Sequence, residues 1–207
     1  MKQIIIAAFL LLGLNSIAQN DSRYVEGLAK DYVAELRTQG VDTLFVRAYM
    51  CEGSVKRFML RDGSWCTSNG SYIDAAVLHM KDGEAFITKI DNCGMFKPVQ
   101  IESSELFDLY TAQEQTLKNE QIKDYETDVE YDEPKSRTEV YNCRWAYVFF
   151  EGEEEFKSRY EELQLTNDPE HPNKNYEYNN NHPLVALEGM IQTTIANLET
   201  QGKFSRK

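Results

Sequence analysis

The chain has 207 residues, of which 42% are hydrophobic and 27% charged, and 34 acidic side chains against 22 Lys and Arg give a formal net charge of −12. This near-average composition excludes a disordered or collagen-like chain, and the length predicts one domain with a hydrophobic core. The negative charge argues against a nucleic-acid partner, because such binding depends on neutralising phosphates with Lys and Arg.

The first residues are typical of a secretory signal peptide. Lys2 supplies positive charge, residues 4–14 form an apolar run, and residues 16–18 include the small side chains that a signal peptidase requires. A membrane anchor is the alternative, but this run reaches across only about half of a bilayer core, which a helix spans with ~20 residues. We therefore predict cleavage after Ala18 and a single mature domain, 19–207, that is secreted or periplasmic and has no transmembrane segment.

The first predicted helix has the clearest periodicity in the chain. Asp21 or Ser22 can cap its N-terminus, and Gly40 stands where a left-handed C-terminal cap belongs. Between them, apolar residues recur at helical spacing and form one stripe. Its members are Val25, Leu28, Ala29, Tyr32, Val33 and Leu36.

Residues 42–91 have the period of strands instead. We predict a four-stranded antiparallel meander whose strands are Thr43–Met50, Val55–Leu60, Ile73–Met80 and Glu84–Ile90. Asp82-Gly83 separates the last two, and this dipeptide between β-rich runs favours a tight hairpin because both residues tolerate positive φ.

The second half of the chain mixes both periods. We expect helices over 105–121, over 153–163 and from Pro183 onward, the last ending before Gly202. Carboxylates at every second position of 124–133 predict a strand, which would form a hairpin with an aromatic strand over 138–150. The predicted fold class is α+β: a mostly antiparallel sheet, built from a meander plus a C-terminal hairpin, with helices packed against one face.

Four cysteines remain after the predicted cleavage. In an oxidising compartment, an even number predicts two disulfides. A zinc site is the alternative, but no pair has the short spacing that zinc ligands show, and a catalytic thiol would be oxidised there. In the predicted meander Cys66 and Cys93 lie at one end and Cys51 at the other. We therefore expect Cys66–Cys93 and, with the remaining partner Cys143, Cys51–Cys143.

Two histidines are the candidates for chemistry. His171 and His182 share the loop over 164–182 with Asp168 and Glu170, and such a group could form a metal or acid–base site. Their spacing does not match a helical His-x₃-His pair, and solvated loop histidines are the alternative. No nucleophile elbow, dinucleotide fingerprint or phosphate loop occurs in the sequence, so we expect no cofactor.

The acidic residues are concentrated in one part of the chain. Residues 102–162 contain 18 acids and 7 bases, a net charge of −11, whereas the flanking parts are nearly neutral. This block increases solubility, and it could also meet a basic protein partner. The alternating carboxylates of 124–132 could bind calcium, but an edge strand that uses charge to prevent aggregation is the favoured interpretation.

A weak resemblance adds to this interpretation. Residues 89–96, Lys-Ile-Asp-Asn-Cys-Gly-Met-Phe, resemble a strand-end pattern in small uncharacterised exported bacterial proteins. The resemblance extends from Cys51 to Phe96 and implies no activity.

Two functions are therefore considered. The favoured one is a non-catalytic exported binding or interaction module, because no catalytic or ligand motif stands out. The alternative is a small hydrolase whose site uses His171, His182 and Glu170.

Overall fold

The computed structural model describes residues 21–129, 143–152 and 154–207. The predicted signal peptide, 1–18, lies outside the described residues, as do 130–142.

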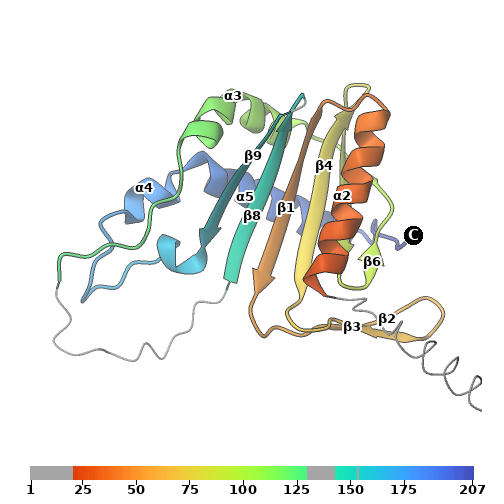
Figure 1. Cartoon of the computed structure of the whole chain (residues 1–207), viewed down its shortest axis with the longest axis horizontal. Helices are drawn as coiled ribbons and strands as arrows, with labels where there is room; N and C mark the ends of the chain where they lie inside the picture. The colour runs from red at the N-terminus through yellow and green to blue at the C-terminus, as the bar shows by residue number, and fades with distance from the viewer. Residues whose placement is uncertain (1–20, 130–142, 153) are drawn as a thin grey trace, which may run out of the picture.

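A seven-stranded antiparallel sheet forms the centre of the fold (Figure 1). Strand β1 is central, because it pairs on one side with β4 and on the other with β8. The order along the sheet is β6 (Gly94–Met95), β5 (Glu84–Asp91), β4 (Ile73–Lys81), β1 (Thr43–Cys51), β8 (Cys143–Glu151) and β9 (Glu154–Glu161), and β7 (Val99–Ile101) pairs with β5.

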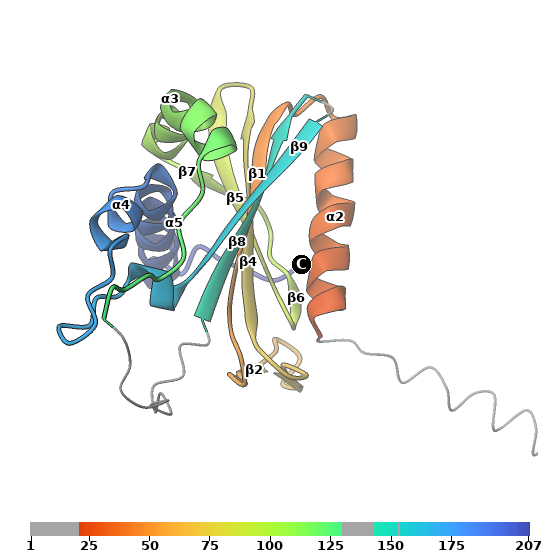
Figure 2. The same cartoon turned by 60° about the vertical axis from the view of Figure 1, so that its left-hand side comes forward.

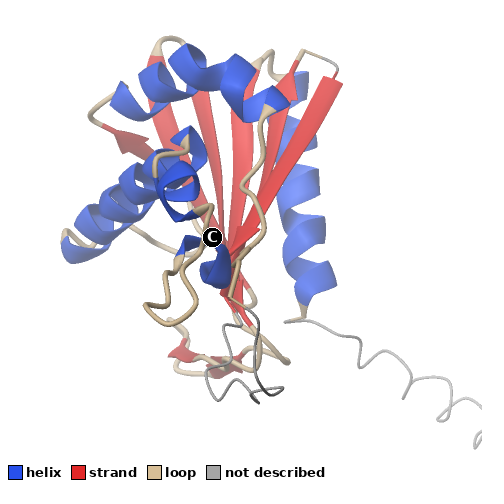
Figure 3. Cartoon of the chain, turned by 90° about the vertical axis from the view of Figure 1, so that its left-hand side faces the viewer, coloured by secondary structure: helices blue, strands red, loops and turns tan. Residues whose placement is uncertain are grey.

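Helices cover both faces of this sheet (Figure 2). Helix α2 (Ser22–Thr38) lies on one face, and α3 (Glu105–Asn119) and α5 (Pro183–Thr200) lie on the other, with the short α4 (Tyr176–Asn180) on the same side. Figure 3 looks onto the face that α3 and α5 cross. The predicted α+β class with an antiparallel sheet is confirmed, but the helices are not confined to one face.

Two apolar layers explain why both faces are covered. Successive side chains of a strand point to opposite faces, and in β1 both Leu44 and Phe45 are fully buried. Leu44 belongs to the layer under α2, and Phe45 to the layer under α3 and α5. Burying one such side chain contributes about 1.5–3 kcal/mol, so each helix is held mainly by its apolar stripe.

The three long helices begin close to where the sequence predicts. The Asp21 carboxylate accepts a hydrogen bond of 2.9 Å from the Tyr24 N–H at the start of α2, and Gly40 follows its end with φ +76°. Helix α5 begins at Pro183, and the Nδ1 atom of its N-cap, His182, accepts a hydrogen bond of 3.1 Å from the Leu184 N–H. Local end signals were therefore sufficient to place α2 and α5, whereas the Ser104 side chain makes no capping hydrogen bond at the start of α3.

The predicted meander is wrong in its second strand. Both hydrogen-bonding edges of β1 are occupied, by β4 and β8, so the segment after Cys51 has no edge of β1 to pair with. It leaves the sheet instead, and β2 (Arg57–Met59) pairs with β3 (Trp65–Thr67) in a separate two-stranded sheet.

The helix predicted over 153–163 is also wrong. Residues 154–161 form strand β9, and a single 3₁₀ turn, η1 (Glu162–Leu165), follows. Phe156, Ser158 and Tyr160 lie opposite the aromatic residues of β8 in this antiparallel pair. Their period of two decides the structure, because β8 offers a hydrogen-bonding edge and an apolar surface at the same time.

The strand predicted over 124–133 is not found in its described part, because residues 124–129 form no strand. Asparagine side chains make the hydrogen bonds that a neighbouring strand would make. Asn179 accepts from the Lys123 N–H and donates to the Lys123 carbonyl, each at 2.9 Å, and Asn175 donates to the Asp124 carbonyl at 2.8 Å. The remaining part of this prediction, 130–133, lies outside the described residues.

Candidate functional site

The β2–β3 hairpin stands apart from the main sheet at one end of the molecule (Figure 1). In its register Arg57 lies opposite Thr67, Phe58 opposite Cys66, and Met59 opposite Trp65. Because opposed residues share a face, Arg57, Met59, Trp65 and Thr67 form one face, which we call the outer face. Phe58 and Cys66 form the inner face.

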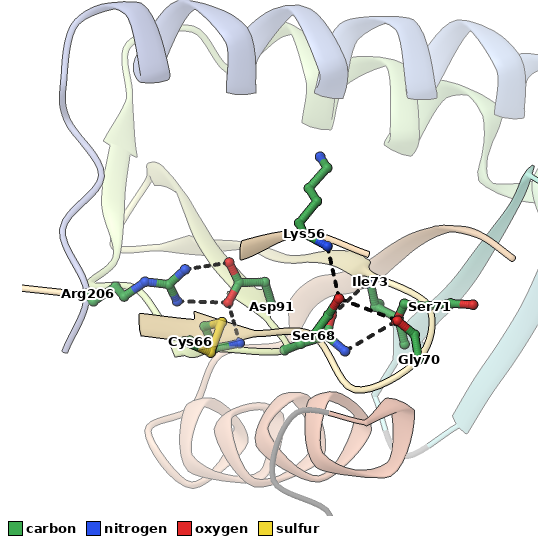
Figure 4. Close-up of a disulfide and its surroundings, with 10 residues drawn as sticks. Lys56, Cys66, Ser68, Gly70, Ser71, Ile73, Asp91 and Arg206 are labelled. Carbon is green, nitrogen blue, oxygen red and sulfur yellow. Dashed lines mark hydrogen bonds and ion pairs between the residues drawn. A yellow bond between two sulfur atoms is a disulfide. The ribbon is translucent and has the colours of Figure 1, made fainter. Parts of the chain in front are cut away.

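The inner face fixes the hairpin to the rest of the protein. The disulfide Cys66–Cys93 joins β3 to the turn after β5 (Figure 4). The ring of Phe58 packs against that of Tyr72, with centroids 5.6 Å apart. One side chain therefore connects each hairpin strand to the rest of the protein: Cys66 of β3 covalently, and Phe58 of β2 by ring packing.

An ion pair with the C-terminal residues supports the same contact. The guanidinium of Arg206 donates to both oxygens of the Asp91 carboxylate, at 2.8 and 2.6 Å, and its carbon lies 5.5 Å from the Phe58 ring centroid. Asp91 is almost completely buried, so Arg206 compensates a charge that would otherwise be costly to bury. The chain end is held there by a backbone bond of 3.0 Å from the Lys207 N–H to the Met95 carbonyl.

Hydrogen bonds also close the base of the hairpin (Figure 4). The Ser68 N–H donates to the Lys56 carbonyl at 2.9 Å, and the Lys56 N–H donates to the Ser68 hydroxyl at 3.0 Å. The Tyr72 N–H donates to the Ser54 carbonyl at 2.6 Å. These bonds and the disulfide restrict the hairpin to one orientation.

Large apolar side chains on the hairpin are exposed. Exposed fractions are 59% for Val55, 68% for Met59 and 56% for Trp65, and only Val129 and Tyr176 are comparable among the described residues. The Arg57 guanidinium lies over the Trp65 ring, 4.2 Å from its centroid. Trp, Met and Arg are enriched at protein interfaces, so this face has the chemistry of a contact surface and offers no acid, base or nucleophile.

The histidines proposed from the sequence have local structural roles. The imidazole of His182 is buried, which lowers its pKa, and its Nδ1 is used as the N-cap of α5. The His171 ring is buried with its Nδ1 3.5 Å from the Asp168 carboxylate, while Glu170 is exposed. Across the residues that the structure describes, no group of three or more His, Cys, Asp or Glu could hold a metal ion, so His171, His182 and Glu170 do not form such a cluster.

A second polar cluster lies between the sheet and α5, around Glu188. The Glu188 carboxylate accepts hydrogen bonds from Arg47 Nε (3.0 and 3.1 Å), Trp145 Nε1 (2.9 Å) and Gln192 Nε2 (2.8 Å), and also from the Tyr147 hydroxyl. Burial alone would lower the pKa of Arg47, but the hydrogen bonds and charge of Glu188 outweigh it and raise that pKa. Protein donors occupy both carboxylate oxygens, so this cluster holds α5 to the sheet and is not a binding site.

Both disulfides have the pairing predicted from the sequence, Cys66–Cys93 and Cys51–Cys143. Comparisons with protein-family models, with curated proteins and with solved structures give no match for this chain. None of the helices in the described ranges combines the length and apolar character that a membrane crossing requires.

The sequence interpretation missed the hairpin as a site. Its apolar residues suited a buried strand of the meander equally well, and nothing in the sequence distinguishes an exposed Trp65 from a buried one. The available signal was the placement of Arg57, Arg61 and Trp65 within one short segment that Cys66 ties to a distant part of the chain.

Proposed function

We propose that the protein is an exported, non-catalytic binding module that contacts its partner through the outer face of the β2–β3 hairpin. The observation that carries this proposal is the exposure of Met59 and Trp65 on a hairpin fixed by a disulfide. A Trp side chain presents about 150–250 Å², so covering the exposed half of Trp65 would contribute roughly 2–3 kcal/mol to binding.

The fixed orientation of the hairpin supports the same role. Binding is weakened when flexible segments must become ordered, and a prearranged surface avoids much of that cost. The Cys66–Cys93 disulfide and the packing of Phe58 supply this prearrangement before any partner arrives. The hairpin is small, so we expect the interaction to be weak and reversible.

The two disulfides support an extracellular or periplasmic location, because such bonds persist in oxidising compartments. Export by cleavage after Ala18 is part of the proposal. A basic partner for the acidic block, 102–162, remains a separate proposal. The hydrolase alternative has no comparable support, because the Nδ1 atom of His182 already accepts the capping hydrogen bond of α5.

Photo-crosslinking in the organism that produces the protein tests the proposal. A photoreactive amino acid replaces Met59 in one variant and the exposed Ala196 of α5 in a control. We expect a discrete adduct from position 59 only. The captured protein is then purified, and its affinity for the oxidised mature domain is measured.

The variants Trp65→Ser and Tyr176→Ser decide the outcome, since each replaces an exposed aromatic residue. We expect Trp65→Ser to weaken binding at least about tenfold, as truncation of a central interface residue does, and Tyr176→Ser to leave it unchanged. Equal affinity of the two variants would refute the proposal.

A further inference from the structure

The structure also indicates the chemistry of the partner. We infer that the outer face recognises a protein segment in which carboxylates flank an apolar side chain. This inference rests on the proposed function, and it adds the partner class that the hairpin would select.

The charge of the hairpin is opposite in sign to that of the whole chain. Residues 54–68 contain Lys56, Arg57, Arg61 and a single acid, Asp62, so three bases and one acid give +2 in a chain of net charge −12. Within the described ranges, none of these three bases forms an ion pair with a carboxylate of this protein. The Asp62 carboxylate accepts hydrogen bonds from the Ser64 N–H (2.9 Å) and hydroxyl (2.6 Å) within the turn. The Nζ of Lys56 lies over the ring of Tyr72, 4.3 Å from its centroid, so Arg57 and Arg61 are the two exposed cations most available to an anionic partner at the outer face.

The position of Arg57 links this charge to the apolar surface. Its guanidinium lies over the Trp65 ring, and a guanidinium has five N–H donors arranged in a plane. Stacking on a ring uses the face of the guanidinium and leaves its edge free to donate two parallel bonds to a carboxylate. A partner carboxylate at Arg57 would thus place its neighbouring side chains beside Met59 and Trp65. The arrangement selects acidic and apolar groups together.

A protein segment fits this surface better than an anionic membrane does. Each Lys or Arg near an anionic bilayer contributes about 1 kcal/mol, so three bases would attract such a surface. A bilayer is an extended plane, however, and a chain of net charge −12 is repelled by an anionic surface as a whole. A narrow segment can contact the hairpin alone and avoids that repulsion.

Matched peptides provide the test. Three synthetic sets share the same central Leu or Phe and differ only in their flanks: Asp and Glu, Lys and Arg, or Ser and Gly. Binding to the oxidised mature domain is measured by fluorescence anisotropy at increasing NaCl concentration. We expect the acidic set to bind most tightly and its affinity to fall as salt screens the charges.

Charge reversal distinguishes recognition from general folding effects. We expect the double variant Arg57→Glu, Arg61→Glu to weaken binding of the acidic set at least about tenfold and to favour the basic set instead. The matched variant Arg57→Lys, Arg61→Lys keeps the charge and should keep the preference for acidic flanks. Both positions changed are exposed, Arg57 in strand β2 and Arg61 in the turn after it, and thermal unfolding of each variant verifies that the fold is retained.

Trp65→Ser separates failure of this inference from failure of the proposed function. Binding that requires Trp65 but shows no preference among the three sets overturns the acidic partner and leaves the contact surface in place. Acidic peptides that bind Trp65→Ser as well as the wild type refute the contact surface itself. Absence of binding to every set, or tighter binding to phosphatidylglycerol vesicles that is lost in the charge-reversed variant, also overturns the inference.

Discussion

Replacing Glu188 by Gln is expected to destabilise the protein strongly, because five donor atoms converge on its carboxylate. Arg47 supplies two of them, Nε and Nη2, and Trp145, Tyr147 and Gln192 supply one each. Arg47 is only 2% exposed, and Gln would leave its charge compensated by Asp74 alone, whose carboxylate lies 3.2 Å from Arg47 Nη1. The amide would also present two N–H groups to side chains that need an acceptor, such as Trp145.

The magnitude follows from these losses. Removing one partner of a buried ion pair costs about 3–5 kcal/mol, and each buried donor left unsatisfied costs about 1–3 kcal/mol. Since Asp74 retains part of the compensation, we expect a loss near the lower limit, about 3 kcal/mol. For a domain of this size, that corresponds to a fall in Tm of roughly 6–12 °C.

Urea denaturation of the oxidised mature domain measures the change. The control is Glu151→Gln in β8, where the carboxylate is 41% exposed and pairs with Lys118, whose side chain is itself 34% exposed; we expect a change within about 1 kcal/mol. A double variant, Arg47→Met with Glu188→Leu, should lose less stability than the sum of its single variants. A cost below about 1 kcal/mol for Glu188→Gln, or an equal cost for the two Gln variants, would show that the cluster does not hold α5 to the sheet.

Three further results are expected. Burial, with a smaller contribution from the charge of Lys81, lowers the pKa of His79 from 6.5 to about 4, so the unfolded chain binds a proton at higher pH than the folded protein. The free energy of unfolding should therefore decrease as the pH falls from 6.5 to about 4. In urea titrations at several pH values, His79→Phe should reduce this pH dependence, and the same dependence in the variant as in the wild type would contradict the role of His79. Replacing both cysteines of Cys66–Cys93 by Ser should lower the free energy of unfolding by about 3.5 kcal/mol, and the same change at Cys51–Cys143, which closes the longer loop, by about 4.5 kcal/mol. Loss of Cys66–Cys93 should also speed hydrogen exchange, mainly in the hairpin. A larger loss of stability for Cys66–Cys93 than for Cys51–Cys143 would refute the loop-length argument. The intact mass of the exported protein should correspond to a chain that begins at Gln19, and a mass that corresponds to a chain beginning at Met1 would exclude cleavage.

Helices and strands whose ends are marked by capping or turn residues were predictable from the sequence. Helix α2 has a capping Asp21 and a following Gly40, and α5 has Pro183 in its first turn, so local chemistry fixes both limits. The β4–β5 hairpin was likewise marked by Asp82-Gly83, whose two residues both have positive φ. Such signals act over a few residues and do not depend on the rest of the fold.

Elements that depend on distant partners were not predictable in the same way. Phe156 and Tyr160 suit one face of a helix, but with Ser158 they also suit one face of a strand, and only the presence of β8 selects the strand. The pairing Cys51–Cys143 was predicted by elimination from a meander that is partly wrong. Its actual cause is that these residues lie directly opposite each other in the β1–β8 register.

The candidate site illustrates the same limit. Whether Trp65 is buried or exposed depends on whether residues 55–60 find an edge of the sheet, and β8, more than 75 residues later in the sequence, occupies that edge. His171 and His182 were predicted as site residues from their residue type, whereas in the structure the ring of His182 caps helix α5. Residue type alone does not reveal such a role.

The central position of β1 has a consequence for the order of folding. As the chain is synthesised, β1 can pair early with β4, but its other edge and the Arg47 side chain must wait for β8 and for Glu188 on α5, near the opposite end of the sequence. Contacts between residues so distant in sequence form slowly, and a partly formed sheet with an unpaired edge is prone to aggregation. We therefore expect β1 to keep one open edge until β8 and α5 have been synthesised, and the N-terminal half to reach its native packing only after that.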